Sequence, residues 1–317
     1  MRWAPCAALL VCAAAMAQPY PARPVKLVVP FPPGSTPDIV GRMLGAKLQE
    51  ALGQPFVVEN RTGAAGNIGT EAVAKAPADG HTLLIGITGP IATNKYLYKS
   101  LPYDPDKDLA PISLLATAPQ LLVVLPALGV DSFGGFIDYA RAHPGRVSYA
   151  SVGSGSASHL TMELLKGEAK LDLVHVPYRG FPPAVTDMLA GNIQAMFAII
   201  PGVLPHVRAG RMKALAVTAL KRSQLAPEVP SVAELGFPQL ESLAWIGLLA
   251  PAATPKEMLE RLSAETMRQM QAADVRELLG KQGFDVVAGT PGDFQRWIRA
   301  ESAKWARVIK ASGATAD

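Results

Sequence analysis

Cysteine, paired metal-binding histidines and long apolar runs are scarce in this chain of 317 residues. Only two cysteines occur, Cys6 and Cys12, and both lie in a leader that we expect to be removed. The mature chain therefore has no thiol for a disulfide, a nucleophile or a metal site. The five histidines lack the H-x-x-x-H and H-x-H spacings, which argues against a metal centre. After the leader we find no apolar run of about 18 residues, so we predict no membrane-spanning helix.

Charge of either sign is also sparse. Lys and Arg number 30 and Asp and Glu 26, so loss of Arg2 with the leader leaves a net charge of 29 − 26 = +3. No block of Lys or Arg occurs, so neither nucleic acid nor a membrane surface is an expected partner. Catalytic signatures are equally thin, because G-x-S-x-G, a P-loop and a full dinucleotide fingerprint are missing. We therefore expect no enzyme and no cofactor.

The leader itself is a positive signal. Arg2 gives it a basic start, residues 4–17 are apolar but too short to cross a bilayer, and an Ala-Met-Ala sequence ends it. We expect cleavage after Ala17 and an exported, soluble product. Lipidation at Cys12 is disfavoured, because Val11 stands where a lipoprotein signal needs a small residue.

Along the mature chain, strand and helix signals alternate. Short β-branched runs lead into small-residue loops and then into helical periodicity, which predicts an α/β fold with mostly parallel sheets. Two extended apolar stretches, 114–125 and 243–249, predict crossing strands between two lobes. The expected division is a signal peptide at 1–17, one lobe of 18–121 plus 244–317, and a second lobe of 122–243.

Four loops follow predicted strands and precede predicted helices: Pro32–Asp38, Asn60–Gly69, Ser151–His159 and Pro177–Pro183. In open α/β sheets such loops gather at the carboxyl ends of the strands, where ligands bind. Helix N-termini present free N–H groups there, and each contributes roughly 0.3–1 kcal/mol to holding an anion without any cationic side chain. Most glycine-rich turns are only turns, but four of them in these positions predict an anion site.

Individual polar residues remain ambiguous from sequence. His159 is either a ligand donor or a packing and capping residue at its helix start, and His175 is typical of a half-buried strand residue. Asp38 and Asp187 lie near helix starts, where interaction with the helix dipole is a sufficient explanation. For Asp38 the alternative is a capping partnership with Ser35.

A family resemblance rests on several segments of the chain, among them VPFPPGSTPD, LGQPFVVENRTGAAGNIG, SVGSGSASHL and LVHVPYRG. In order, and nearly end to end, the chain resembles the substrate-binding receptors of tripartite tricarboxylate transporters, the Bug family. The resemblance implies a periplasmic, two-lobed Venus-flytrap receptor, expected to be a monomer, that closes on a small carboxylate. It also implies docking to a two-component integral membrane permease.

The resemblance further implies where a ligand would bind. The first two loops would cradle one carboxylate with backbone groups, partly through ordered water, and the other lobe would meet the distal part of the ligand. The implied positions are Phe31, Pro33, Gly34 and Ser35; Gly63, Ala64, Ala65 and Gly66; Ser151, Gly153, Ser156 and His159; and Tyr178, Arg179, Gly180 and Ala198.

This chain departs from the family pattern at several of these positions. Ser35 replaces a glycine, Pro37 precedes Asp38, and Ala65 takes the place of a glycine. Ala198 stands where the family commonly has an aspartate, so an acceptor for a ligand ammonium or hydroxyl is lost. Our hypothesis is an aromatic or aliphatic carboxylate that is less polar at its distal end.

Two other functions are compatible with parts of this pattern. A sensory receptor that presents its closed form to a membrane sensor would have the same fold and pocket. An exported carboxylate-acting enzyme would need a nucleophile with its base, or a metal cluster, and the sequence contains neither signature.

Overall fold

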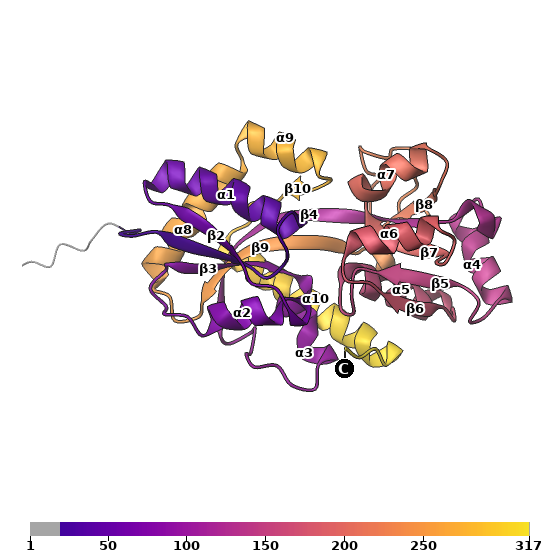
Figure 1. The fold of residues 1–317 in the computed structure, drawn as a ribbon, viewed down its shortest axis with the longest axis horizontal. Coiled ribbons are helices and arrows are strands. Elements are labelled where there is room, and N and C mark those ends of the chain that lie inside the picture. The colour runs from indigo at the N-terminus through magenta and orange to yellow at the C-terminus, as the bar shows by residue number, and fades with distance from the viewer. Residues whose placement is uncertain (1–19, 317) are drawn as a thin grey trace, which may run out of the picture.

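The computed structural model describes residues 20–316, so the expected leader and its cleavage site lie outside the described part. The molecule is an α/β protein with two lobes side by side, joined by two long strands that run between them (Figure 1). The first half of the chain contributes β1 (Val25–Val29), α1 (Thr36–Leu52), β2 (Phe56–Asn60), η1 (Ala64–Gly66), α2 (Asn67–Ala74), β3 (Thr82–Ile87), η2 (Gly89–Thr93), α3 (Asn94–Leu97), β4 (Leu109–Val124), η3 (Pro126–Leu128), α4 (Phe133–Ala142) and β5 (Ser148–Ser151). The second half contributes α5 (Ala157–Ala169), β6 (Val174–Pro177), α6 (Phe181–Leu189), β7 (Ala195–Ile199), α7 (Ile200–Arg208), β8 (Lys213–Val217), η4 (Pro238–Leu240), β9 (Leu243–Pro251), α8 (Lys256–Met270), α9 (Ala273–Lys281), β10 (Asp285–Val286) and α10 (Pro291–Ser312).

The two lobes repeat one strand order. Lobe 1 has the order β2-β1-β3-β9-β4, with β10 on the far side of β4, and lobe 2 has the order β6-β5-β7-β4-β8. The outer ladders, β2-β1-β3 and β6-β5-β7, are parallel as predicted. The antiparallel ladders all involve β4 or β9, because a strand that crosses from one lobe enters the next sheet in the opposite direction. The sheets are therefore mixed, with parallel ladders outside and antiparallel ladders at the crossing.

The crossing lies where the two apolar stretches predicted it. β4 pairs with β9 as far as Pro119 and with β7 and β8 from Gln120 onward. One buried hydroxyl links the two crossing strands. Thr218 Oγ1 accepts from Gln120 N of β4 (2.8 Å) and donates to the carbonyl of Ser242 (2.6 Å), which directly precedes β9. The division into units 18–121 plus 244–317 and 122–243 stays a prediction, although the change of pairing falls within two residues of its first boundary.

Helix α1 shows how closely helices pack on these sheets. Val40, Leu44 and Leu48 recur at helical spacing and are fully buried against β1 and β2. A Cβ atom on Gly41 would lie 3.1 Å from Val29, so glycine on this face permits the close approach.

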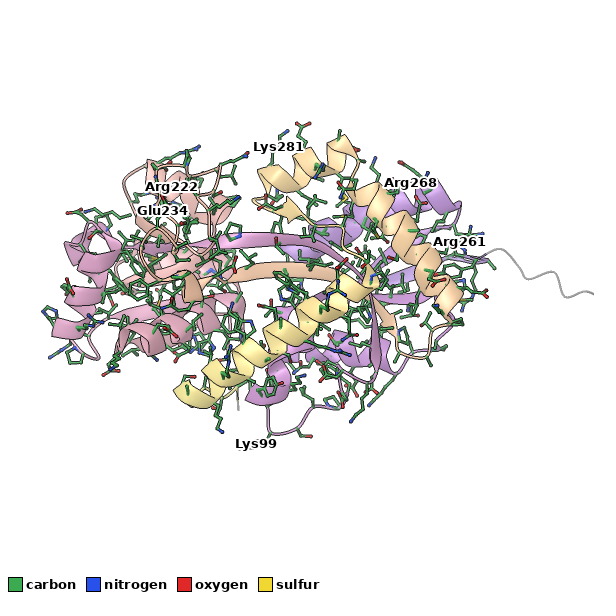
Figure 2. All side chains as sticks on the ribbon, turned by 180° about the vertical axis from the view of Figure 1, so that it is seen from behind. Lys99, Arg222, Glu234, Arg261, Arg268 and Lys281 are labelled. Carbon is green, nitrogen blue, oxygen red and sulfur yellow. The ribbon has the colours of Figure 1, made fainter. Side chains whose placement is uncertain are left out.

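Helix α10 connects the two lobes on the opposite side. In Figure 2 it runs obliquely past the two crossing strands, in yellow. Its residues Trp305, Val308 and Ile309 form one apolar cluster with Leu97 of lobe 1 and Leu160 of lobe 2. The carboxyl-terminal helix thus belongs to the packing of both lobes.

Candidate ligand-binding site

The loop between β1 and α1 is held by a buried carboxylate. Gly34 adopts a positive φ of 79°, and its N–H donates to Asp38 Oδ2 at 2.8 Å. Ser35 is the N-cap residue of α1, but its hydroxyl donates to the carbonyl of Pro32 (2.6 Å) and makes no side-chain cap. The predicted positions Phe31, Pro33, Gly34 and Ser35 therefore lie in one compact turn at the end of β1.

Asp38 also ties this loop to β2. Only 2% of the residue is exposed, and its carboxylate accepts from Asn60 Nδ2 (2.9 Å) and Arg42 Nε (3.0 Å). The same Asn60 amide donates to the carbonyl of Phe31 (2.9 Å). Burial raises the pKa of Asp38, but the hydrogen bonds from Arg42, Gly34 and Asn60 outweigh it, so the pKa lies below its ordinary value. Asp38 is an anchor for the loop, and the sequence-based alternatives, a dipole contact or a cap with Ser35, understate it.

The second loop carries four consecutive residues with positive φ. These angles are 126° at Gly63, 44° at Ala64, 51° at Ala65 and 91° at Gly66. A left-handed conformation costs an alanine about 1 kcal/mol, and such strain clusters at functional sites. A Cβ atom on Gly66 would lie 2.8 Å from Pro90 and 3.1 Å from the ring of Phe31. The second loop is thus packed against both the first loop and the turn after β3.

The turn after β3 was not predicted from sequence. Thr88 is buried there, and the π-helical turn η2 leads directly into α3. Asn94, which is 1% exposed, donates from Nδ2 to Asn67 Oδ1 (2.6 Å) just behind the second loop, and Tyr103 donates to the same oxygen (3.0 Å). Because π-helical turns are frequent at functional sites, this third loop belongs to the candidate site. The signal available was the Thr-Gly-Pro sequence at the end of a predicted strand.

In lobe 2 the loop after β5 is equivalent to the first loop of lobe 1. Ser151 Oγ lies 2.7 Å from His175 Nε2 and accepts from the N–H of Gly153 (3.2 Å). Ser156 caps α5, because its hydroxyl accepts from the N–H of His159 (3.3 Å). Ser151, Gly153 and Ser156 thus lie in the loop after β5 and His159 lies in the first turn of α5, while their contact with a ligand stays a prediction.

Two stacked histidines lie beneath this loop. His159 is 3% exposed, and its Nδ1 accepts from the N–H of Gly155 at 3.0 Å. Its ring stacks on that of His175, with centroids 3.9 Å apart and 9° between the planes. Burial lowers the pKa of His159 to about 4, and burial together with the neighbouring His159 lowers the pKa of His175 to about 3. His159 is therefore engaged with the loop backbone, while its role as a ligand donor stays a prediction.

The second loop of lobe 2 is more open. The Tyr178 hydroxyl donates to Asp187, and burial with this carboxylate raises the pKa of Tyr178 to about 12. Asp187 also accepts from Asn192 (2.8 Å), so it has specific partners besides the helix dipole. Arg179 is exposed, and a Cβ atom on Gly180 would meet no described atom within 4 Å.

Ala198 lies at the end of β7 and is 4% exposed. It belongs to an apolar cluster of lobe 2, against which Tyr178 and Phe181 pack. The next residues, Ile199 and Ile200, are also apolar, and Ile199 packs against the core of lobe 1. The surroundings of Ala198 are therefore apolar, and of these three residues Ile199 is the one that is partly exposed.

Besides the packing of α10 and Ile199, the two lobes meet at Gly155 and at Gly283. Thr93 Oγ1 donates to the carbonyl of Gly155 (3.2 Å), and a Cβ atom on Gly155 would lie 2.5 Å from Leu97 Cδ1. On the other side, a Cβ atom on Gly283 would lie 2.6 Å from Pro201. Gly155 and Thr93 were not among the predicted positions, because this contact depends on how the lobes meet.

Two surface hollows lie on lobe 1 around Lys95 and Asp106, and none of the predicted ligand-binding residues lines them. Among residues 20–316, no group of His, Cys, Asp and Glu is arranged to hold a metal ion. Within the same range, no helix has the length and apolarity to cross a membrane.

Comparison with known proteins agrees with this architecture. The family model described as tripartite tricarboxylate transporter family receptor matches residues 40–314. The chain therefore belongs to the tripartite tricarboxylate transporter receptor family, a family of solute-binding receptors.

Named relatives include the Bug proteins. The chain is 39% identical to protein BugT of Bordetella pertussis over 305 residues, which cover 96% of this chain and 94% of BugT. It is 40% identical over 291 residues to a UPF0065 protein in the tcbD-tcbE intergenic region of Pseudomonas sp. (strain P51), with 92% and 86% of the two chains covered.

Solved structures with bound carboxylates are also similar. R. palustris Rpa4515 with adipate has a TM-score of 0.85 and 37% identity, covering 93% of this chain and 99% of that one. MatC from Rhodopseudomonas palustris with bound malate has a TM-score of 0.81 and 33% identity, covering 92% and 100%.

Proposed function

We propose that this protein is a periplasmic receptor that captures a small carboxylate between its lobes and delivers it to the membrane part of a tripartite tricarboxylate transporter. The observation that carries the proposal is the meeting of three backbone-lined loops at the strand ends of lobe 1. Gly34 and residues 63–66 have positive φ, and Gly66 is packed against Phe31 and Pro90. Backbone N–H groups at helix starts hold an anion without a nearby cation.

The relatives support a carboxylate as the ligand. Rpa4515 and MatC, at 37% and 33% identity, were solved with adipate and malate. In this chain, Ala198 and Ile199 leave the lobe-2 side of the site apolar, so we expect a carboxylate whose distal part is aliphatic or aromatic. Arg179 is exposed on the same lobe and is available to a second carboxylate at the far end of a longer ligand.

We infer that the units 18–121 plus 244–317 and 122–243 close on the ligand as rigid bodies about β4 and β9. A ligand that contacts both lobes shifts the population toward the closed form. The expected working form is a monomer that presents its closed face to a two-component permease.

The first test is a thermal-shift panel of carboxylates. We expect adipate and aromatic monocarboxylates to raise the melting temperature more than malate does. Selective stabilisation by aspartate or glutamate would contradict the apolar distal end. Mass spectrometry of ligand released from protein purified from its native host identifies the compound directly.

Closure and delivery need separate measurements. Small-angle scattering should show a smaller radius of gyration with the stabilising carboxylate, and an unchanged radius at saturation would contradict closure. Loss of uptake of the radiolabelled carboxylate in a deletion strain supports transport. Normal uptake with a lost transcriptional response would indicate sensing instead.

A further inference from the structure

A short chain of hydrogen bonds runs from lobe 1 to the stacked histidines of lobe 2. Thr93, which is fully buried, donates from its hydroxyl to the carbonyl of Gly155 at 3.2 Å. The N–H of the same Gly155 donates to His159 Nδ1 at 3.0 Å. One glycine residue therefore carries both the contact between the lobes and the contact with His159.

The second histidine holds the other end of the same loop. His175 Nε2 lies 2.7 Å from Ser151 Oγ, which in turn accepts from the N–H of Gly153. Because the rings of His159 and His175 stack at 3.9 Å, the two supports form one unit. This unit supports the segment 151–155 at both of its ends, at Ser151 and at Gly155.

Only neutral rings fit this arrangement. His159 Nδ1 needs a free electron pair to accept from Gly155, and a protonated ring would turn an N–H toward another N–H. Two imidazolium rings 3.9 Å apart would also repel each other strongly in a buried site. Protonation of His159 at Nδ1 therefore breaks the hydrogen bond that Gly155 N–H donates to it.

The surroundings compensate for such a charge only in part, because Glu163 favours a protonated His175 and Lys166 opposes it. Tyr149 of β5 stacks on His175, and its hydroxyl donates to Glu163. Lys166, also on α5, pairs with Glu163 at 2.7 Å, so the nearest carboxylate is already matched by a cation. From lobe 1, Thr93 contributes a neutral hydroxyl at Gly155, and α10 carries the buried Glu301, which accepts from Trp305 Nε1 at 2.8 Å.

We propose that His159 and His175 are positioning residues whose neutral form holds Gly155 against Thr93, so that protonation in acid separates the lobes and releases the ligand. The release of a ligand in acid rests on the proposed function, whereas the separation of the lobes in acid does not depend on it. The direction agrees with the shifts described above, because burial holds the pKa of both histidines below the ordinary value and so disfavours the protonated form in this arrangement.

The test compares two substitutions at one position. His159→Asn places an amide oxygen where Nδ1 accepts and does not titrate, whereas His159→Leu removes the acceptor. Exposed His143, whose Nδ1 lies 2.9 Å from the carbonyl of Tyr139, provides the matched control His143→Asn. The probe is adipate, with its Kd measured by calorimetry from pH 7.5 to pH 4.5.

For the wild type and His143→Asn we expect the Kd to rise with acid by up to about tenfold per pH unit below pH 6.5. Relative to its own Kd at pH 7.5, His159→Asn should show a flatter profile than the wild type. Protonation of adipate changes the Kd equally in all variants, so it cancels when the pH profile of His159→Asn is compared with that of the wild type. Identical profiles for wild type and His159→Asn would overturn the proposal.

Lobe separation is measured without any ligand. The described chain has no cysteine, so one introduced on each lobe, at the exposed positions Ser100 and Val174, carries a pair of spin labels. The distance should lengthen between pH 7.5 and pH 4.5 in wild type and change less in His159→Asn. An unchanged distance in wild type would overturn the proposal even if adipate binds.

Two outcomes need to be kept apart. Failure of every carboxylate to bind at pH 7.5 counts against the proposed function, while the distance measurement still decides the closure proposal. If His159→Asn fails to fold, His175→Gln takes its place, because its amide lies where Nε2 meets Ser151 and does not titrate.

Discussion

The two lobes share a strand order but hold their equivalent loops with different chemistry. In lobe 1 the anchor is ionic, because the Asp38 carboxylate binds Gly34, Asn60 and Arg42. In lobe 2 the anchor is the neutral stack of His159 and His175. Protonation would remove the charge from the first anchor and would add a charge to the second, so acid acts on the two equivalent loops by different chemistry.

Packing around the loops differs in the same direction. Gly66 of lobe 1 is enclosed by Phe31 and Pro90, whereas Gly180 of lobe 2 has open space beside it. A tightly packed loop keeps its N–H groups in place for any carboxylate, and an open loop adapts to the remainder of the ligand. We therefore assign anion affinity mainly to lobe 1 and ligand discrimination mainly to lobe 2.

The largest effect should come from Gly66→Ala. The left-handed backbone costs about 1 kcal/mol and the overlap with Pro90 about 2 kcal/mol more, so the free energy of unfolding should fall by about 3 kcal/mol. Gly191 of lobe 2 is a matched control, because its φ is also 91° but a Cβ atom there would meet nothing within 4 Å. In denaturant unfolding, Gly191→Ala should lower the free energy of unfolding by about 1 kcal/mol. If both substitutions lowered it equally, the proposed difference in packing between the lobes would be wrong.

Asp38→Asn should lower the free energy of unfolding by about 2 kcal/mol at pH 7, because hydrogen bonds to a charged, buried group are replaced by weaker ones. The pKa of Asp38 is lowered in the folded state, so its contribution is complete above pH 3.8 and is lost as the pH falls through the folded pKa. Urea unfolding from pH 7 to pH 2.5 should show the two proteins converging in acid. Exposed Asp274→Asn loses a surface ion pair with Lys47 and should lower the free energy of unfolding by much less than Asp38→Asn does. A difference in stability between wild type and Asp38→Asn that stays constant with pH would mean that geometry and not charge anchors the loop.

The two N-cap serines separate affinity from stability. Ser35 makes no side-chain cap, so Ser35→Ala should weaken binding of the stabilising carboxylate about fivefold with little loss of stability. Ser156 does cap α5, so Ser156→Ala should lower the free energy of unfolding by about 1 kcal/mol. Calorimetric titration and thermal unfolding of both variants measure these effects. Unchanged affinity in Ser35→Ala would show that the Ser35 hydroxyl does not contribute to carboxylate binding.

The smallest effect is expected for Ala65→Gly, which restores the residue common in the family. Glycine avoids the strain of the left-handed conformation, which should stabilise the folded state by about 1 kcal/mol. Glycine also raises the conformational entropy of the unfolded chain, which should destabilise the folded state by about as much. The net change in stability should stay within about 0.5 kcal/mol, by denaturant unfolding. A loss of affinity above tenfold would show instead that the methyl group contacts the ligand.

Much of the lobe-1 site was readable from sequence because its signals are local. A strand followed by Pro-Pro-Gly-Ser, and a second strand followed by Gly-Ala-Ala-Gly, predicted the two loops that Asp38 and Asn60 join. The apolar stretches that form β4 and β9 were also local signals, and they predicted the crossing.

The remainder depends on contacts between distant segments. Thr93 meets Gly155 across 62 residues, and no local pattern marks either as a contact. The π-helical turn after β3 has neither strand nor ordinary helix periodicity, so it was passed over. His159 was ambiguous because its partner, the N–H of Gly155, becomes available only when the loop takes its left-handed turn at φ 77°.

The last described residues lie beside the contact between the lobes. After α10, the N–H of Ala316 donates to the carbonyl of Leu97 (3.1 Å), and the side chain of Leu97 faces Gly155. A fluorophore attached next to Ala316 would therefore experience a change of environment each time Gly155 approaches or withdraws. The receptor can thus serve as a scaffold for a carboxylate biosensor in which the reporter is attached outside every ligand-binding loop.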